Sequence, residues 1–237
     1  MTVNAFEDAD DNPADWPART HRAVRPRDAA TLIIVRRDEA EPKVMMGRRH
    51  GGHSFMPDKW VFPGGRIDRA DFAAPHGTDL RPDVAARLAK TAPLARARAL
   101  AMAAVRETFE EVGLLLATPA PPRIGAGPWR EFLALGAAPD LAALDFVARA
   151  VTPPSSPKRF DARFFMADAA RLISLERQPD CGELDEIAWF GLDDALALNL
   201  PTVTRFVLRE LPTRLVEPGL PAPSLRFMRG RQQLIHL

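Results

Sequence analysis

The sequence predicts a single α+β domain preceded by a flexible arm, and three observations carry this prediction. The chain has 237 residues, enough to bury one substantial core without disulfides. Segments with the composition of strands outnumber the long helical segments. Residues 1–27 are polar and acidic with few branched apolar residues, so we expect them to lack fixed structure and the domain to occupy residues 28–237.

The expected elements alternate with loops rich in glycine and proline. The β-branched segment 31–36 and the segment 43–48 flank a polar stretch and predict a β-hairpin. Residues 225–237 predict either a closing strand pair or a basic tail. Further strands are expected at 60–62, 146–151, 159–166 and 183–190, and helices at 129–135, 141–144, 193–198 and 202–211.

The strongest helical pattern covers residues 94–112. This segment contains neither proline nor glycine and is dense in Ala, Leu, Arg and Glu, which are strong helix formers. Gly113 follows it directly, where a left-handed C-terminal cap is common. The sequence therefore predicts a helix that ends at Gly113.

The composition excludes several classes of function. Lys and Arg total 32 against 31 Asp and Glu, and the net charge of +1 creates no overall field for nucleic acid or an anionic membrane. Cys181 is the only cysteine, which excludes an internal disulfide. No stretch approaches the roughly 18 apolar residues of a membrane span, and no export signal is present. We expect a cytoplasmic protein with a small-molecule partner, no nucleic acid and no membrane, and a homodimer remains open.

Three carboxylates gather at the end of the long helix. Glu107, Glu110 and Glu111 fall within about 100° of arc on a helix, beside Gly113, where the helix dipole disfavours acids. Their mutual repulsion adds to this cost. A hard divalent cation reverses the sign of both effects because it prefers carboxylate oxygens, so the cluster predicts a Mg²⁺ or Mn²⁺ site. The alternative is a solvated helix face with Arg106 and Glu110 as an ordinary ion pair.

The residues around this cluster match a known pattern. Residues 106–114, RETFEEVGL, resemble the second half of the Nudix box, R-E-hydrophobic-x-E-E-x-G-hydrophobic, with Thr108 in the first hydrophobic position. Residues 62–65, FPGG, resemble the start of that box. The chain thus resembles the Nudix hydrolase family. This resemblance implies an α/β/α sandwich with a mixed β-sheet between helices, and metal-assisted hydrolysis of a diphosphate by water.

The resemblance also implies roles for the acidic cluster. Glu107, Glu110 and Glu111 would be metal ligands, while Glu107, Glu110 and Arg106 would be catalytic. Glu107 is a candidate base, and Arg106 would orient the carboxylates through ion pairs. Glu183 or Glu186 could serve as the base instead, with an exposed strand edge as the alternative for both.

Other residues are candidates for binding phosphate. Gly64 and Gly65 would let backbone amides approach a phosphate or the metal ligands because no Cβ intervenes. Arg48, Arg49 and Arg159 could meet a phosphate through a bidentate guanidinium, and Arg48 ranks first among them. With 32 basic residues in the chain, the base rate favours an ordinary surface charge for each of the three.

The interval inside the box is longer than the usual 13 residues. Residues 66–105 make 40, which is an insertion of 27 (40 − 13), placed at about 71–93. Asp71 stands at the sixth position after Gly65, where the family usually has glutamate, so it is a further candidate.

The length of this interval favours one class of substrate. Together with the sequence FMP at 55–57, the VFPGG motif at 61–65 and Asp68, it is similar to the branch that cleaves coenzyme A and acyl-coenzyme A. The alternatives are hydrolysis of ADP-ribose, dinucleotides or other nucleoside diphosphate derivatives, and a non-catalytic Nudix-fold binding or regulatory module. The intact glutamates disfavour the last of these.

Overall fold

A computed structural model describes residues 24–52, 57–178, 184–228 and 231–237 of the chain. Most of the predicted flexible arm therefore lies outside the described residues, as do Cys181 and Glu183. Arg27, the last residue of that predicted arm, already belongs to the first strand. None of the helices in the described part is long and apolar enough to cross a membrane.

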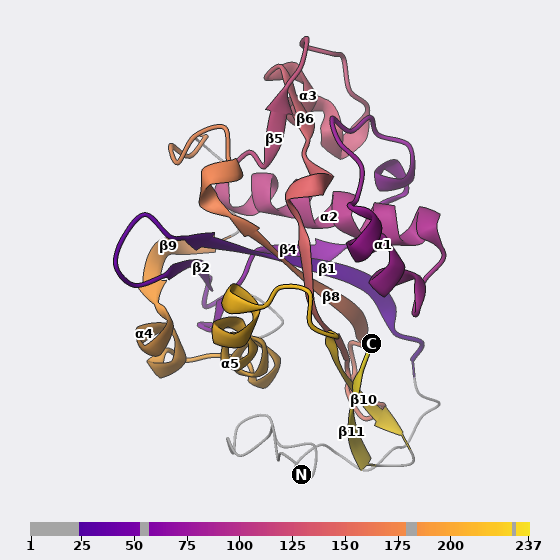
Figure 1. Cartoon of the computed structure of the whole chain (residues 1–237), viewed down its shortest axis with the longest axis vertical. Helices are drawn as coiled ribbons and strands as arrows, with labels where there is room; N and C mark the ends of the chain where they lie inside the picture. The colour runs from indigo at the N-terminus through magenta and orange to yellow at the C-terminus, as the bar shows by residue number, and fades with distance from the viewer. Residues whose placement is uncertain (1–23, 53–56, 179–183, 229–230) are drawn as a thin grey trace.

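A mixed β-sheet forms the middle layer (Figure 1). Its strand order is β11-β10-β7-β8-β1-β2-β3, with β4 also beside β1 and β9 also beside β2. The β1–β8 and β7–β10 pairs are parallel, and the other described pairs are antiparallel. The strands are β1 (Arg27–Arg36), β2 (Lys43–Arg49), β3 (Trp60–Val61), β4 (Gly64–Arg66), β7 (Asp145–Val151), β8 (Phe160–Asp168), β9 (Leu184–Gly191), β10 (Pro223–Met228) and β11 (Arg231–His236).

Helices cover both faces of this sheet (Figure 1). Alternate residues of β1 face opposite layers, because side chains of a strand alternate. Leu32 packs in the core that contains α1 and α2, and Ile33 packs in the core that contains α4 and α5. This arrangement confirms the predicted α+β sandwich with a mixed sheet between helices. The helices are α1 (Pro82–Ala89), α2 (Leu94–Val112), α3 (Arg130–Ala134), α4 (Leu192–Ala197) and α5 (Thr202–Val216).

The long helix α2 has the bounds that its sequence predicts. Gly113 follows it with φ of 71°, the left-handed conformation that glycine adopts without strain. Thr108, which occupies a hydrophobic position of the motif, is fully buried. Its hydroxyl donates to the carbonyl of Ala104 at 2.8 Å, so the buried polar group is satisfied within the helix.

The structure differs from the expected elements in several places, and one of them is residues 141–144, where a 3₁₀ helix (Leu141–Ala143) replaces the expected helix. A second small sheet pairs β5 (Ala117–Pro119) with β6 (Ala137–Pro139), where prolines predict only a loop; both prolines stand at strand ends, where a missing N–H is tolerated. The helix α5 continues through Pro212 beyond its predicted end. Arg214, in that extension, donates to the carbonyls of Leu220 and Pro221 at 2.6 and 2.7 Å and so supports the last turn. The chain end forms the strand pair β10–β11, the first of the two expected alternatives.

The predicted insertion packs against α2. It contains α1, and the two helices are in contact (Figure 1). The guanidinium of Arg98 on α2 binds the carboxylate of Asp79 in the insertion, with one hydrogen bond of 2.9 Å. The segment is thus attached to the helix that carries the acidic cluster.

Candidate active site

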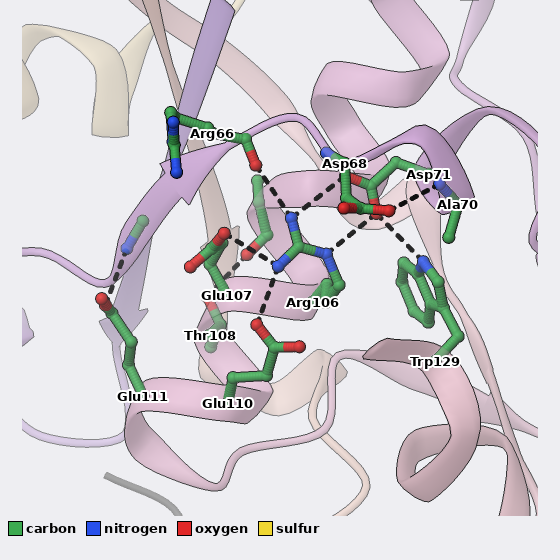
Figure 2. Close-up of polar contacts among 12 residues, drawn as sticks. Arg66, Asp68, Ala70, Asp71, Arg106, Glu107, Thr108, Glu110, Glu111 and Trp129 are labelled. Atoms are coloured by element: carbon green, nitrogen blue, oxygen red, sulfur yellow. Dashed lines mark hydrogen bonds and ion pairs between the residues drawn. The ribbon is translucent and has the colours of Figure 1, made fainter. Parts of the chain in front are cut away.

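The end of α2 brings two carboxylates to the glycines that begin β4. The amide of Gly64 donates to Oε2 of Glu111 at 2.9 Å (Figure 2). A Cβ on Gly65 would lie 2.4 Å from Cδ of Glu107, so only glycine leaves room for that carboxylate. The two glycines therefore have the expected roles. The amide of Gly64 binds the carboxylate of Glu111, and the missing Cβ of Gly65 leaves room for the carboxylate of Glu107.

Arg106 lies at the centre of a buried hydrogen-bond network (Figure 2). Its Nη1 donates to Glu107 at 2.8 Å and to Glu110 at 2.7 Å. Its Nε and Nη2 donate to the two oxygens of Asp71 at 2.9 and 3.1 Å, and Nη2 also donates to the carbonyl of Arg66 at 2.9 Å. Burial alone would lower the pKa of Arg106, but hydrogen bonds to Asp71 and the charges of Glu107, Asp71 and Glu110 raise it above its ordinary value.

Asp71 is a positioning residue behind Arg106. It is 2% exposed, and its carboxylate also accepts hydrogen bonds from Nε1 of Trp129 at 3.0 Å and from the amide of Asp68 at 2.8 Å. With its oxygens occupied in this way, Asp71 holds the guanidinium and does not face a ligand. Trp129 was not among the expected site residues, because 58 residues separate it from Asp71 and no local pattern links them.

The third carboxylate, Glu110, faces Arg106. Burial raises the pKa of Glu110 above its ordinary value; the charge of Arg106 opposes this shift, and the charge of Glu107 adds to it. Within the described ranges, no three acidic, histidine or cysteine side chains are arranged as a ready metal site. The physical reason is that Arg106 holds Glu107 and Glu110, while the amide of Gly64 holds Glu111.

The donor set nevertheless fits a hard divalent cation in its chemistry. The carboxylates of Glu107 and Glu111 line one cavity, and oxygen ligands of this type are those that Mg²⁺ and Mn²⁺ prefer. A cation beside Glu110 would favour the ionised form that burial now disfavours. Glu107 and Glu111 are thus the residues placed to hold such an ion, and Glu110 would have to turn from Arg106 to join them.

Two cavities meet at this point. The first, which we name the apolar cavity, has a volume of about 930 Å³ and runs from Glu107 and Glu111 to a wall of hydrophobic side chains. The second, the arginine cavity, has a volume of about 880 Å³. Arg66 and Glu107 line both cavities. The wall of the apolar cavity includes Val151, Phe160, Phe164, Val203, Leu225 and Phe227, and the arginine cavity is lined by Arg25, Arg27, Arg66, Arg69, Arg96 and Phe72.

Of the three candidate phosphate-binding arginines, Arg49 lines the apolar cavity, whereas Arg48 and Arg159 do not. Arg48, the first choice, has its Nε 3.4 Å from the carboxylate of Glu186 on the edge strand β9 and does not line the apolar cavity. The neighbouring Arg49 lines that cavity. Among the described residues, the buried Nε atoms of both arginines have no hydrogen-bond partner, so the cavity lining, and not this feature, distinguishes them. The pairing of β2 with β9 is irregular between Arg48 and Arg49, so the regular alternation of strand side chains does not decide which of the two lines the cavity.

Two further candidates, Arg159 and Glu186, also contact residues outside the acidic cluster. Arg159 donates to the carbonyls of Thr152 at 3.1 Å and Val24 at 2.7 Å, so it joins the start of the described chain to the β7–β8 loop. The carboxylate of Glu186 is about half exposed and pairs with Arg48, which matches the strand-edge alternative. Glu183 lies outside the described residues, and no position is assigned to it.

The comparisons with known proteins agree with this fold and this motif. No protein-family model matches the chain. A solved Nudix hydrolase from Alicyclobacillus acidocaldarius is 30% identical, with a TM-score of 0.57 over 78% of this chain and 90% of that one. The chain belongs to the Nudix hydrolase family.

A curated relative is similar over a shorter region. Acyl-coenzyme A diphosphatase NUDT19 of Gallus gallus is 36% identical over a region that spans 34% of this chain and 27% of that protein. The matched region is thus about a quarter of the relative's length.

Substitutions at the two glycines of this Nudix hydrolase are expected to affect different properties, activity for Gly65 and stability for Gly64. We expect Gly65→Ala to lower kcat/KM at least tenfold with a small change in Tm, because the new Cβ meets the end of the Glu107 side chain. Gly64→Ala is the matched comparison: its Cβ would lie 2.5 Å from the backbone oxygen of Ala30, so it should lower Tm. Kinetics and thermal unfolding of both variants measure this contrast, and a Gly65→Ala enzyme with wild-type kcat/KM would contradict it.

Proposed function

We propose that this Nudix hydrolase cleaves the diphosphate of coenzyme A or an acyl-coenzyme A, with Mg²⁺ or Mn²⁺ as cofactor. Family membership makes it a hydrolase of nucleoside diphosphate derivatives. The finer assignment rests on the shape and lining of the apolar cavity.

The observation that carries the proposal is the junction of carboxylates with an apolar wall. Coenzyme A joins a diphosphate to a long pantetheine arm that carries the acyl chain. A cavity with Glu107 and Glu111 at one end and Phe160 and Phe164 along its side matches this change from charged to apolar. The hydroxyl groups of the terminal ribose of ADP-ribose would lie unpaired against Phe160 and Phe164, whereas the threonine and serine side chains in the same lining could pair with only some of them.

Two other observations support this substrate class. The long interval between Gly65 and Arg106 is similar to that of the coenzyme A branch. The partial similarity to the chicken acyl-coenzyme A diphosphatase points the same way.

The chemistry follows from the positions of the side chains. A bound divalent cation would offset the negative charge of the phosphates and make an attacking water more acidic. We assign Glu107 as the base that takes the proton from water, because its carboxylate lies where the two cavities meet. Arg106 holds Glu107 and Glu110 in place. The water oxygen forms a bond to one phosphorus and the bridging P–O bond breaks, which leaves adenosine bisphosphate and a phosphopantetheine.

A substrate panel tests this function. With purified full-length protein and magnesium, we expect the highest kcat/KM on coenzyme A or an acyl-coenzyme A and lower values on ADP-ribose and diadenosine polyphosphates. Turnover of ADP-ribose without cleavage of any coenzyme A species would refute the substrate assignment. Binding without turnover of any compound, with magnesium or manganese, would indicate a ligand-binding module.

Substitutions of the adjacent residues Arg49 and Arg48 give a test variant and its control. Arg49→Ala should raise KM for the preferred substrate about tenfold, because a charge-assisted hydrogen bond is lost. Arg48→Ala removes the same charge one position away, at the ion pair with Glu186, and should change KM less than about twofold.

A further inference from the structure

The arginine cavity is lined by positively charged side chains from separate parts of the chain. Arg27 lies on β1, Arg69 lies in the 3₁₀ helix Arg69–Phe72, and Arg96 lies on the exposed side of α2. Arg25 and Arg66 complete the set. Segments that are distant in sequence thus converge on one hollow of about 880 Å³.

Most of this charge has no partner within the cavity. Arg96 pairs with Asp28 at 3.4 Å, and the carboxylate of Asp28 also lies 3.6 Å from Nη1 of the buried Arg163. Arg163 likewise engages Asp161 at 2.7 Å. The other two acidic residues of this lining are Asp68, which accepts from the amide of Ala70, and Glu107, which accepts from Arg106, so all four carboxylates already have partners. The guanidinium groups of the remaining four arginines form no hydrogen bond or ion pair with any residue that the structure describes. These four are Arg25, Arg27, Arg66 and Arg69.

Guanidinium groups that face a hollow favour an anion, and their geometry favours a phosphate. A guanidinium can donate two parallel hydrogen bonds to phosphate oxygens. An aromatic ring lies in the same cavity: Phe72 is 56% exposed, which is unusual for a large apolar side chain. An exposed ring beside arginines is a surface on which a nucleobase can stack.

A substrate whose diphosphate lies where the two cavities meet would extend into one cavity on each side. Arg66 and Glu107 line both cavities, so a diphosphate at Glu107 has the apolar cavity on one side and the arginine cavity on the other. The carbonyl of Arg66 faces Arg106, while its side chain points away from that network (Figure 2). The side chain of Arg66 is therefore available to both cavities.

We propose that the arginine cavity binds the nucleoside half of the substrate and recognises a phosphate monoester on its ribose, separate from the diphosphate that is cleaved. This inference rests on the proposed function and extends it. The enzyme then selects nucleotides that carry this additional phosphate, and the pantetheine arm occupies the apolar cavity.

Kinetics with two substrates test the recognition of this phosphate. The wild-type enzyme should have a kcat/KM for coenzyme A roughly tenfold or more above that for 3′-dephospho-coenzyme A, because the additional phosphate gains charge-assisted hydrogen bonds. The double variant Arg27→Ala/Arg69→Ala should bring this ratio close to one. Arg209→Ala removes an exposed arginine from α5, in the opposite layer, and should keep the wild-type ratio.

A binding measurement separates failure of this inference from failure of the proposed function. Equal kcat/KM for the two substrates in the wild type would overturn the inference and leave the coenzyme A assignment intact. If no coenzyme A species is cleaved, calorimetry with adenosine 3′,5′-bisphosphate and adenosine 5′-monophosphate decides. Roughly tenfold tighter binding of the bisphosphate, lost in the double variant, supports the cavity assignment, and equal affinities overturn it.

Discussion

Glu107→Gln is expected to lower kcat/KM about a thousandfold while changing the free energy of unfolding by less than about 1 kcal/mol. The carboxylate of Glu107 lies where the two cavities meet, and a neutral amide there would bind a divalent cation weakly and could not accept a proton from water. The amide oxygen of glutamine can still accept the hydrogen bond from Arg106, so the fold should persist. Steady-state kinetics at saturating magnesium and urea unfolding measure the two quantities.

Two further variants make this result specific. Glu131→Gln changes an exposed glutamate on α3 and should leave kcat/KM unchanged. Glu110→Gln should also reduce activity strongly if Glu110 joins the metal ligands, although its carboxylate now faces Arg106. Wild-type kcat/KM in both Glu107→Gln and Glu110→Gln would show that the acidic cluster holds no catalytic metal.

Arg106→Met is expected to destabilise the protein by about 3–5 kcal/mol. Its removal leaves Asp71, which is 2% exposed, as a buried carboxylate without a cationic partner, and it also leaves the carbonyl of Arg66 without this donor. Methionine fills a similar volume, so the loss would come from the broken network and not from a cavity. Urea denaturation followed by circular dichroism measures the effect.

The same helix supplies the control for this variant. Arg98 lies two turns earlier on α2 and binds Asp79 in a more exposed pair, so Arg98→Met should cost less than about 1 kcal/mol. Adding Asp71→Asn to Arg106→Met removes the uncompensated charge and should restore part of the lost stability. Equal losses for Arg106→Met and Arg98→Met would contradict a special role for the buried network.

Local patterns account for the parts of the fold that could be predicted. The composition of residues 94–112 and the glycine that follows are enough to place α2 and its left-handed cap, because both depend on neighbours in sequence. The convergence of Glu107, Glu110 and Glu111 on one helix face follows from the same local geometry. The positions of β1, β2, β3, β7, β8 and β9 are predicted to within about four residues for similar reasons, whereas β4, β5 and β6 are not predicted.

The rest of the site depends on contacts that no local pattern contains. Asp71 faces Arg106 and Trp129 only after three separate segments have packed together. Arg49 lines the apolar cavity and Arg48 does not, and the pairing of β2 with β9 is irregular between these two residues. The arginine cavity likewise arises from tertiary packing, since its side chains come from β1, a 3₁₀ helix and α2.

The contacts of Arg106 also explain how the family motif accommodates so long an interval. The chain leaves the site at Asp71 and returns to it at Arg106. Hydrogen bonds between these two residues join the two ends of the loop beside the carboxylates. This loop spans 35 residues, against 8 (35 − 27) in the usual box. The entropy lost on closing a loop grows only with the logarithm of its length, so the difference costs roughly 1 kcal/mol. The segment beyond Asp71 can therefore change in length and sequence between relatives while the carboxylates keep their positions.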